Sequence, residues 1–338
     1  ERFADVAALS ALGGFIAGGH SGIGSIRHGI LADPGNVRRL RIVTLQDPPQ
    51  VLDLPTDWPR PKTRSESGAR LRRVVDPTLS QRVKALAVQE GATMNVLLLS
   101  VFASLLHRYS GQEEFLIGSP YHGRNERRWE HVLGCFINSL ALRMRFPAGL
   151  TFRALLQEVR RRSHAALANA DYPFPLVVER LRPQRDPSRT PLFQVMFGYE
   201  NYQGADLIFS TLAGGVQSAD LDSLFGVPLT PLGLSQQEGG FDLSMSATET
   251  NGLLRYSLSY STDLFARRTV EQMAAHFEQL LLAVTENPEQ PIATLPFDSK
   301  TFGTAANNGQ MIAEISANHR AARMFQQMAR RLTGRSEP

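Results

Sequence analysis

The middle of the chain begins with two predicted helices. Asp76-Pro77 is typical of a helix start and Gly91 of a helix end, so we expect an amphipathic helix between them. Residues 94–109 follow as a second helix, which Thr93 can cap. This second helix is apolar on most of its sides, which indicates a buried position.

Shorter apolar runs after these helices predict strands. Residues 115–118, 136–144 and 191–199 have the length and composition that are typical of strands. Two stretches of alternating apolar and polar residues, 241–247 and 254–260, flank Asn251-Gly252. Because Asn-Gly accepts the two positive φ angles of a type I′ turn, we expect a hairpin here.

Two amphipathic helices complete the pattern. One begins after Thr151, which can cap it, and the other covers 267–286 with a single apolar stripe. Strands combined with one-sided helices predict a two-layer α/β domain. In it, a mixed β-sheet is covered by helices, and the chain ends form irregular extensions.

Composition narrows the setting of this domain. Of 338 residues, 42% are hydrophobic and 20% are charged, which allows a sizeable core. No apolar run reaches the length of a membrane span and no leader precedes the domain, so a cytoplasmic location without a membrane partner is predicted. The single cysteine, Cys135, lies in an apolar run and is predicted to be a small buried residue rather than a nucleophile.

The charged residues and the histidines argue against two further kinds of site, a nucleic-acid surface and a metal site. The net charge of +4 comes largely from arginine clusters, but aromatic residues are only 8% of the chain and mostly lie on predicted apolar faces. A nucleic-acid surface would combine both features, so no nucleic-acid partner is expected. The eight histidines include no His-x-x-x-His pair and no Cys/His group, so we expect no metal site.

Three motifs occur in a fixed order in the middle stretch. Leu133–Arg143 matches the G-x-F-V-N-T strand and its Arg in peptide-synthetase condensation domains. Ala170–Phe174 matches the family's Q-D-Y-P-F-E motif, with Pro175 in place of Glu. Arg185–Leu192 matches R-D-x-S-R-N-P-L, with Thr in place of Asn. Residues 51–297 therefore resemble the C-terminal half of a nonribosomal peptide synthetase condensation domain.

This resemblance implies a half-domain that is similar to chloramphenicol acetyltransferase and forms one wall of a tunnel. In the family, the second His of H-H-x-x-x-D-G, which belongs to the other half, assists the amine that attacks a thioester. Both substrates are borne on the phosphopantetheine arms of carrier proteins. This sequence has no two adjacent histidines. We therefore expect no catalytic residue, no cofactor and no peptide-bond formation by the chain alone. Peptidyl or aminoacyl carrier proteins and the missing N-terminal half are the expected partners.

The resemblance also suggests which residues line the tunnel or the interface between the halves. They are Asn138, Ser139, Arg143, Asp171, Tyr172, Arg185, Asp186 and Arg189. The exposed wall that they belong to is expected to be apolar and prone to association.

Several of these residues have a structural interpretation of their own. Asn138 lies in an apolar strand, so we expect a hydrogen bond to another element rather than to a ligand. Arg185, Asp186 and Arg189 are predicted to fix a loop by charge-assisted bonds. Tyr172 precedes a proline, which favours extended backbone followed by a helix start.

The first 50 residues are rich in glycine. They contain no Walker loop, dinucleotide fingerprint or nucleophile elbow. Their amino-acid sequence resembles the second flavin-contacting segment of FAD-linked oxidases. The resemblance implies remnant cofactor contacts, which we predict to be non-functional, so that no FAD is bound. These contacts would be made by Gly18, Gly19, Gly22, Gly24 and Ser25.

The last segment, 298–338, resembles the C-terminal end of pilus-assembly ATPases of the MinD/ParA type, without their Walker lysine loop. Three signatures in one chain suggest a joined, chimeric sequence divided into 1–50, 51–297 and 298–338. Its predicted function is that of a partial condensation domain, inactive alone. A module that docks a carrier protein or the partner half is the alternative, and an FAD-linked oxidoreductase fragment is a weaker one.

Overall fold

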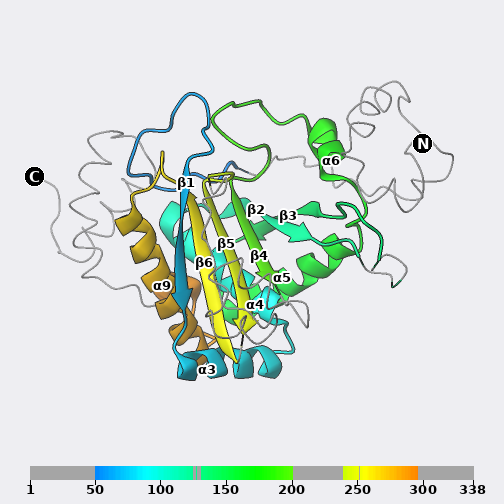
Figure 1. Ribbon diagram of the computed structural model, residues 1–338. Helices are drawn as coiled ribbons and strands as arrows, with labels where there is room; N and C mark the ends of the chain where they lie inside the picture. Colours follow the sequence, from blue (N-terminus) through cyan, green and yellow to red (C-terminus); the bar gives the residue numbers. More distant parts are fainter. Residues whose placement is uncertain (1–49, 125–126, 128–130, 201–238, 251, 296–338) are drawn as a thin grey trace, which may run out of the picture.

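The structure, a computed structural model, describes residues 50–124, 127, 131–200, 239–250 and 252–295. These residues form a mixed six-stranded sheet of order β1-β6-β5-β4-β2-β3 (Figure 1). The strand β4 runs parallel to its neighbours β2 and β5, and the other neighbouring strands are antiparallel. The strands are β1 (Gly68–Val74), β2 (Glu114–Tyr121), β3 (Asn138–Arg145), β4 (Val195–Glu200), β5 (Leu243–Thr250) and β6 (Leu253–Ser261).

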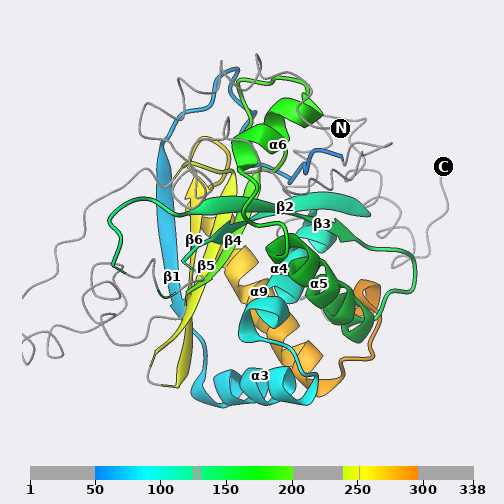
Figure 2. The same cartoon turned by 90° about the vertical axis from the view of Figure 1, so that its right-hand side faces the viewer.

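Four long helices lie together on one face of this sheet, and Figure 2 shows them on the same side of the strands. They are α3 (Pro77–Gln89), α4 (Met94–Ser110), α5 (Phe152–Leu167) and α9 (Arg267–Glu286). A short helix, α6 (Phe174–Leu181), lies beyond the start of β3, and a 3₁₀ turn, η3 (Ile292–Thr294), follows α9. The predicted two-layer α/β architecture is therefore confirmed.

The core fills the space between the sheet and the four helices. Alternate residues of each strand belong to it, for example Leu243 and Met245 in β5 and Leu258 in β6. Helix α4 is the most deeply buried element, since nearly all of its apolar side chains lie in the core. The stripe predicted for α9 also faces the core, and its Val270 and Phe277 are fully buried.

The predicted helix starts are confirmed by their caps. The Asp76 carboxylate accepts hydrogen bonds from Thr78 N and Leu79 N, at 2.8 and 3.1 Å. The Thr93 hydroxyl accepts from Val96 N, and α4 ends before a glycine in the left-handed region. Side-chain oxygens satisfy amides that the first helical turn leaves unpaired, which explains why these positions begin helices.

The hairpin is confirmed in its register. Thr250 pairs with Leu253 at the end of the β5–β6 ladder, which leaves a two-residue connection. Gly252 has a φ of +74°, as a turn of this kind requires. Asn251 lies outside the described residues.

Two predicted strands begin later than expected. The stretch 191–199 forms a strand only from Val195, because Pro191 has no N–H to donate and Leu192 has a φ of +67°. Likewise 136–144 pairs with β2 only from Asn138 onward.

The prediction that Cys135 is buried is wrong, because its side chain is exposed. It lies in the extended segment before β3, where Phe136 turns inward and is 2% exposed. Arg124 lies over the Phe136 ring, with its guanidinium carbon 4.2 Å from the ring centroid. Since successive side chains of an extended segment point to opposite sides, Cys135 and Ile137 face outward.

In the described ranges, no single helix is long and apolar enough to cross a membrane. Helices α3 and α4 meet the length and composition test only as a pair, with a bend of 108° between them. The apolar character of α4 has another cause, because its side chains form the core. The predicted flavin-oxidase-like segment, apart from Gln50, and the ATPase-like segment 298–338 lie outside the described residues, so both remain predictions.

Candidate functional site

Asn138 ties the start of β3 to the connection between α5 and α6. Its side-chain amide donates to Ala170 O at 2.8 Å and to Tyr172 O at 2.7 Å, and its carbonyl accepts from Phe174 N at 3.0 Å. These three bonds use both donor hydrogens and the acceptor. The predicted cross-element bond is confirmed, and the Asn138 amide has no donor left for a ligand.

An extended segment before β1, residues 50–67, lies across the starts of the central strands, and we call it the strap. The backbone of the strap bonds to two buried glutamine side chains instead of to a neighbouring strand. The Gln112 amide accepts from Asp53 N at 2.7 Å and donates to Val51 O at 3.0 Å. The Gln194 amide accepts from Leu52 N at 3.2 Å. Buried backbone groups need such partners, so the strap is an integral part of the fold.

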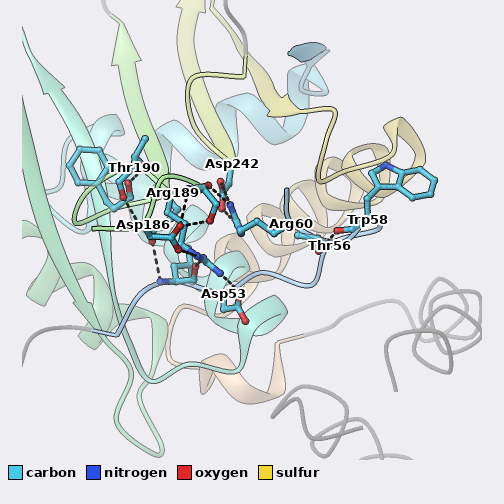
Figure 3. A network of polar contacts seen from close by, with 12 residues as sticks. Asp53, Thr56, Trp58, Arg60, Asp186, Arg189, Thr190 and Asp242 are labelled. Carbon is cyan, nitrogen blue, oxygen red and sulfur yellow. Dashed lines mark hydrogen bonds and ion pairs between the residues drawn. The ribbon is translucent and has the colours of Figure 1, made fainter. Parts of the chain in front are cut away.

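Residues of the third sequence motif, Arg185–Leu192, contact the strap (Figure 3). Arg189 donates to Asp53 Oδ1 at 3.0 Å and to Leu52 O at 3.3 Å, and its Nε lies 3.6 Å from Asp186 Oδ2. Asp186 accepts bonds from the Ser188 hydroxyl and amide, which lower the pKa of its carboxyl below the usual value. The predicted loop-fixing role is confirmed for Asp186 and Arg189.

A second ion pair fixes the other end of the strap. Arg60 forms a two-point contact with the Asp242 carboxylate and donates to Ser188 O at 3.1 Å. Asp242 is 5% exposed, so this pair is largely removed from water. A buried carboxylate needs such charge-assisted partners. Sequence reasoning missed Arg60, because 182 residues separate it from Asp242.

Three aromatic rings join the motifs on the sheet. Phe174 and Phe193 have ring centroids 5.1 Å apart, and Phe193 and Phe241 have centroids 5.8 Å apart. A Cβ at Gly118 in β2 would lie 2.2 Å from the Phe193 ring, so only glycine fits beneath that ring. The second and third motifs and the start of β5 therefore meet at one corner of the sheet.

Other predicted site residues are paired differently or remain at the surface. Arg143 bonds to Glu114, and this bond lowers the pKa of the Glu114 carboxyl to about 2. Tyr172 is half-buried, and burial raises the pKa of its phenol. Asp171 and Arg185 are exposed.

The sheet face opposite the four helices differs from the apolar wall that was expected. Register places the side chains of this face in rows that run across the sheet. One row consists of Arg70, Ser259, Ser244, Met196 and Gly118, and the next of Arg72, Ser257, Ser246 and Gly198. No described helix packs on these rows (Figure 2). Most apolar residues of the strands point to the other side, so this face is lined mainly by polar and small side chains, with Met196 as an exception.

His122 follows the pairing partner of Asn138, and its Nδ1 already accepts a hydrogen bond from a backbone amide. Tyr121 pairs with Asn138, and His122 follows it at the surface. Arg124 N donates to His122 Nδ1 at 3.0 Å, so a neutral His122 carries its proton on Nε2. No group of three or more metal-ligating side chains occurs among the described residues.

Comparison with solved structures identifies the class of fold. The chain is similar to a four-domain nonribosomal peptide synthetase bound to AMP and glycine, with a TM-score of 0.68 and 30% identity over 74% of this chain and 19% of that one. It also shares its fold with the X-domain of teicoplanin biosynthesis in complex with OxyB, at a TM-score of 0.62 and 23% identity, over 74% of this chain and 52% of that one. The fold is therefore the chloramphenicol-acetyltransferase-like fold of condensation domains.

The family model named Condensation domain matches residues 44–302, and the chain belongs to this family. It is 38% identical over 240 residues to bacitracin synthase 3 of Bacillus licheniformis and 38% identical over 249 residues to malpinin synthetase of Mortierella alpina. These alignments cover 71% and 74% of this chain but only 4% and 3% of the relatives. The chain thus spans a small part of the synthetases that it matches.

Proposed function

We propose that this chain forms one wall of a peptide-condensation site and does not join aminoacyl thioesters by itself. Three findings support the proposal: membership of the condensation-domain family, likeness to a solved structure of a nonribosomal peptide synthetase, and a sequence of eight histidines without an adjacent pair. Carrier-borne thioesters are the substrates that this function implies.

The observation that carries the proposal is what the motif residues do in this chain. Asn138, Asp186 and Arg189 hold loops and the strap, and their hydrogen bonds are directed at protein atoms. A wall of this kind positions reactants, whereas amide formation needs a group that takes a proton from the attacking amine. The sheet face with its hydroxyl groups is available to line the path of an extended substrate.

A reconstituted assay tests this function. Two carrier proteins loaded with aminoacyl thioesters are incubated with the chain, and dipeptide is measured by mass spectrometry. An intact condensation domain from one of the relatives serves as the positive control. We expect dipeptide from the control and none above buffer from this chain. Dipeptide formed by the chain alone would contradict the proposal.

An exposed apolar stripe favours a second function, that of a docking module for the partner half. Leu133 is 98% exposed and Ile137 is 65% exposed, in the segment before β3 that also carries the exposed Cys135. Contiguous exposed apolar residues of this kind often mark interaction sites. We expect Leu133→Asp together with Ile137→Asp to abolish saturable binding of an N-terminal condensation half. Val88→Asp, at an exposed apolar position on α3, serves as the matched control.

A further inference from the structure

The two edges of the sheet differ in whether another strand can pair with them. At the β3 edge, Arg162 of α5 donates to Arg143 O at 2.6 Å, and Arg162 is itself held by Glu158. This side chain occupies a backbone acceptor that an added strand would need. At the other edge, β1 pairs only with β6, and the described residues place no strand on its outer side.

The side chains near the β1 edge have one sign of charge on the face opposite the helices. Arg72 is exposed in β1, and Arg255 pairs with Val74 from the neighbouring strand β6. The residues of β1, β5 and β6 that alternate toward this face include no acidic side chain. A strand added beside β1 would therefore meet a cationic surface on one of its faces.

Arg255 is a second cation beside this edge. Its side chain is only partly buried, and Val74 of β1 is its pairing partner in the sheet. A carboxylate is the acceptor that matches a guanidinium best. The backbone edge and the two arginines are independent observations, and both favour an acidic, extended ligand.

We propose that the β1 edge binds an extended acidic peptide segment, which adds a seventh strand to the sheet. Main-chain hydrogen bonds to β1 supply affinity, and carboxylates on alternate residues pair with Arg72 and Arg255. The other alternate residues would face the helix layer, where α9 packs against β1. A second copy of the chain is disfavoured as the occupant, because edge-to-edge pairing would bring arginine-rich strands together. The proposed condensation function does not use the backbone edge of β1, although Arg72 lies on the sheet face assigned to the substrate path.

The probe is a synthetic peptide of alternating glutamate and valine, eight residues long, titrated against the complete chain by fluorescence anisotropy. Two N-methylated versions carry their methyl groups either on all glutamates or on all valines. Alternate amides of a strand point to opposite edges, so one version blocks pairing with β1 and the other does not. We expect one version to lose at least tenfold in affinity and the other to bind like the parent peptide.

Charge variants provide the second measurement. Arg72→Glu is expected to weaken binding of the parent peptide at least tenfold, whereas Arg160→Glu, at an exposed arginine of α5, leaves binding within twofold. A lysine-valine peptide should not bind. The proposal is overturned if the parent peptide does not saturate, if both N-methylated peptides bind equally, or if the two arginine variants behave alike. Dimerisation through β1, seen by sedimentation and lost in Arg72→Glu, would also overturn it, as would competition by single-stranded DNA.

Discussion

The two faces of the sheet are built from the same strands and are specialised in opposite ways. The face under α3, α4, α5 and α9 is filled by large apolar side chains, such as Phe197 packed against Phe102 at a centroid distance of 5.9 Å. The opposite face carries mainly glycine, serine and arginine on the intervening positions, together with Met196. One face therefore supplies most of the stability, and the other is left with a surface that can meet substrates or partner chains.

The largest expected effect comes from the helix-covered face. Phe197→Ala removes a fully buried ring and should lower the free energy of unfolding by about 3–5 kcal/mol, measured by urea denaturation. Met196→Ala, the neighbouring position on the opposite face, is the matched control and should cost clearly less. Equal losses at the two positions would show that both faces are packed alike.

A smaller loss is expected at Asn138, where a motif residue joins β3 to the α5–α6 connection. Asn138→Leu leaves Phe174 N and the carbonyls of Ala170 and Tyr172 without their partner, so the free energy of unfolding should fall by about 1–3 kcal/mol. Ser139→Ala, one position along the strand, should change it by less than about 0.5 kcal/mol. If Asn138→Leu is as stable as the parent, the three bonds do not hold the connection.

Gly118 tests a place where the sheet face opposite the helices is tightly packed. Gly118→Ala forces the Phe193 ring to move and should cost about 1–3 kcal/mol by overpacking. At Gly198, in the next row of the same face, an added Cβ would lie 3.4 Å from Pro120, so Gly198→Ala should be tolerated much better. Urea denaturation of both variants under the same conditions would show whether the loss of stability is limited to the position beneath the Phe193 ring.

The comparison also shows what the sequence could reveal. Local patterns predicted the helices, caps and hairpin correctly, because periodicity and capping residues act over a few positions. The Arg60–Asp242 pair and the glutamines that hold the strap join residues far apart in the sequence, so no local pattern could indicate them. The polar face could have been predicted, since serines alternate with apolar residues in β5 and β6. The expectation of an apolar wall came from the family resemblance rather than from that alternation.

As the pH falls, protonation near the helix-covered face should lower the stability before the surface ion pairs are lost. Burial, above all, lowers the pKa of His107 below 6.5, in a site where its Nδ1 bonds to Gln112 O and its ring stacks on Phe146. The unfolded chain then binds the proton more tightly than the folded one, so stability falls as the pH drops below about 6.5. The Glu114 carboxyl, with its pKa of about 2, contributes stability that is lost only below about pH 4.5.

His107→Gln separates these two windows. Between pH 7 and pH 5, the parent should lose more of its free energy of unfolding than the variant, as measured by urea denaturation at each pH. Both proteins should lose further stability below pH 4.5, where Glu114 begins to be protonated in the unfolded chain. A variant that loses as much as the parent between pH 7 and pH 5 would assign the acid sensitivity to another group.

The smallest effect is expected in the middle of the open face. Ser246 is exposed, and its lateral neighbours in the sheet are Ser257 and Gly198, so Ser246→Ala removes a hydroxyl that water can solvate. The free energy of unfolding should change by less than about 0.5 kcal/mol.

Ser100, which is fully buried in α4 and donates to Val96 O at 2.7 Å, is the contrasting position. Its replacement by valine should be clearly destabilising, because the added volume has no space in a close-packed helix layer. A face on which side chains can be exchanged without loss of stability is free to vary with the ligand that it meets, and a substantial loss in Ser246→Ala would show that this face is instead part of the folded core.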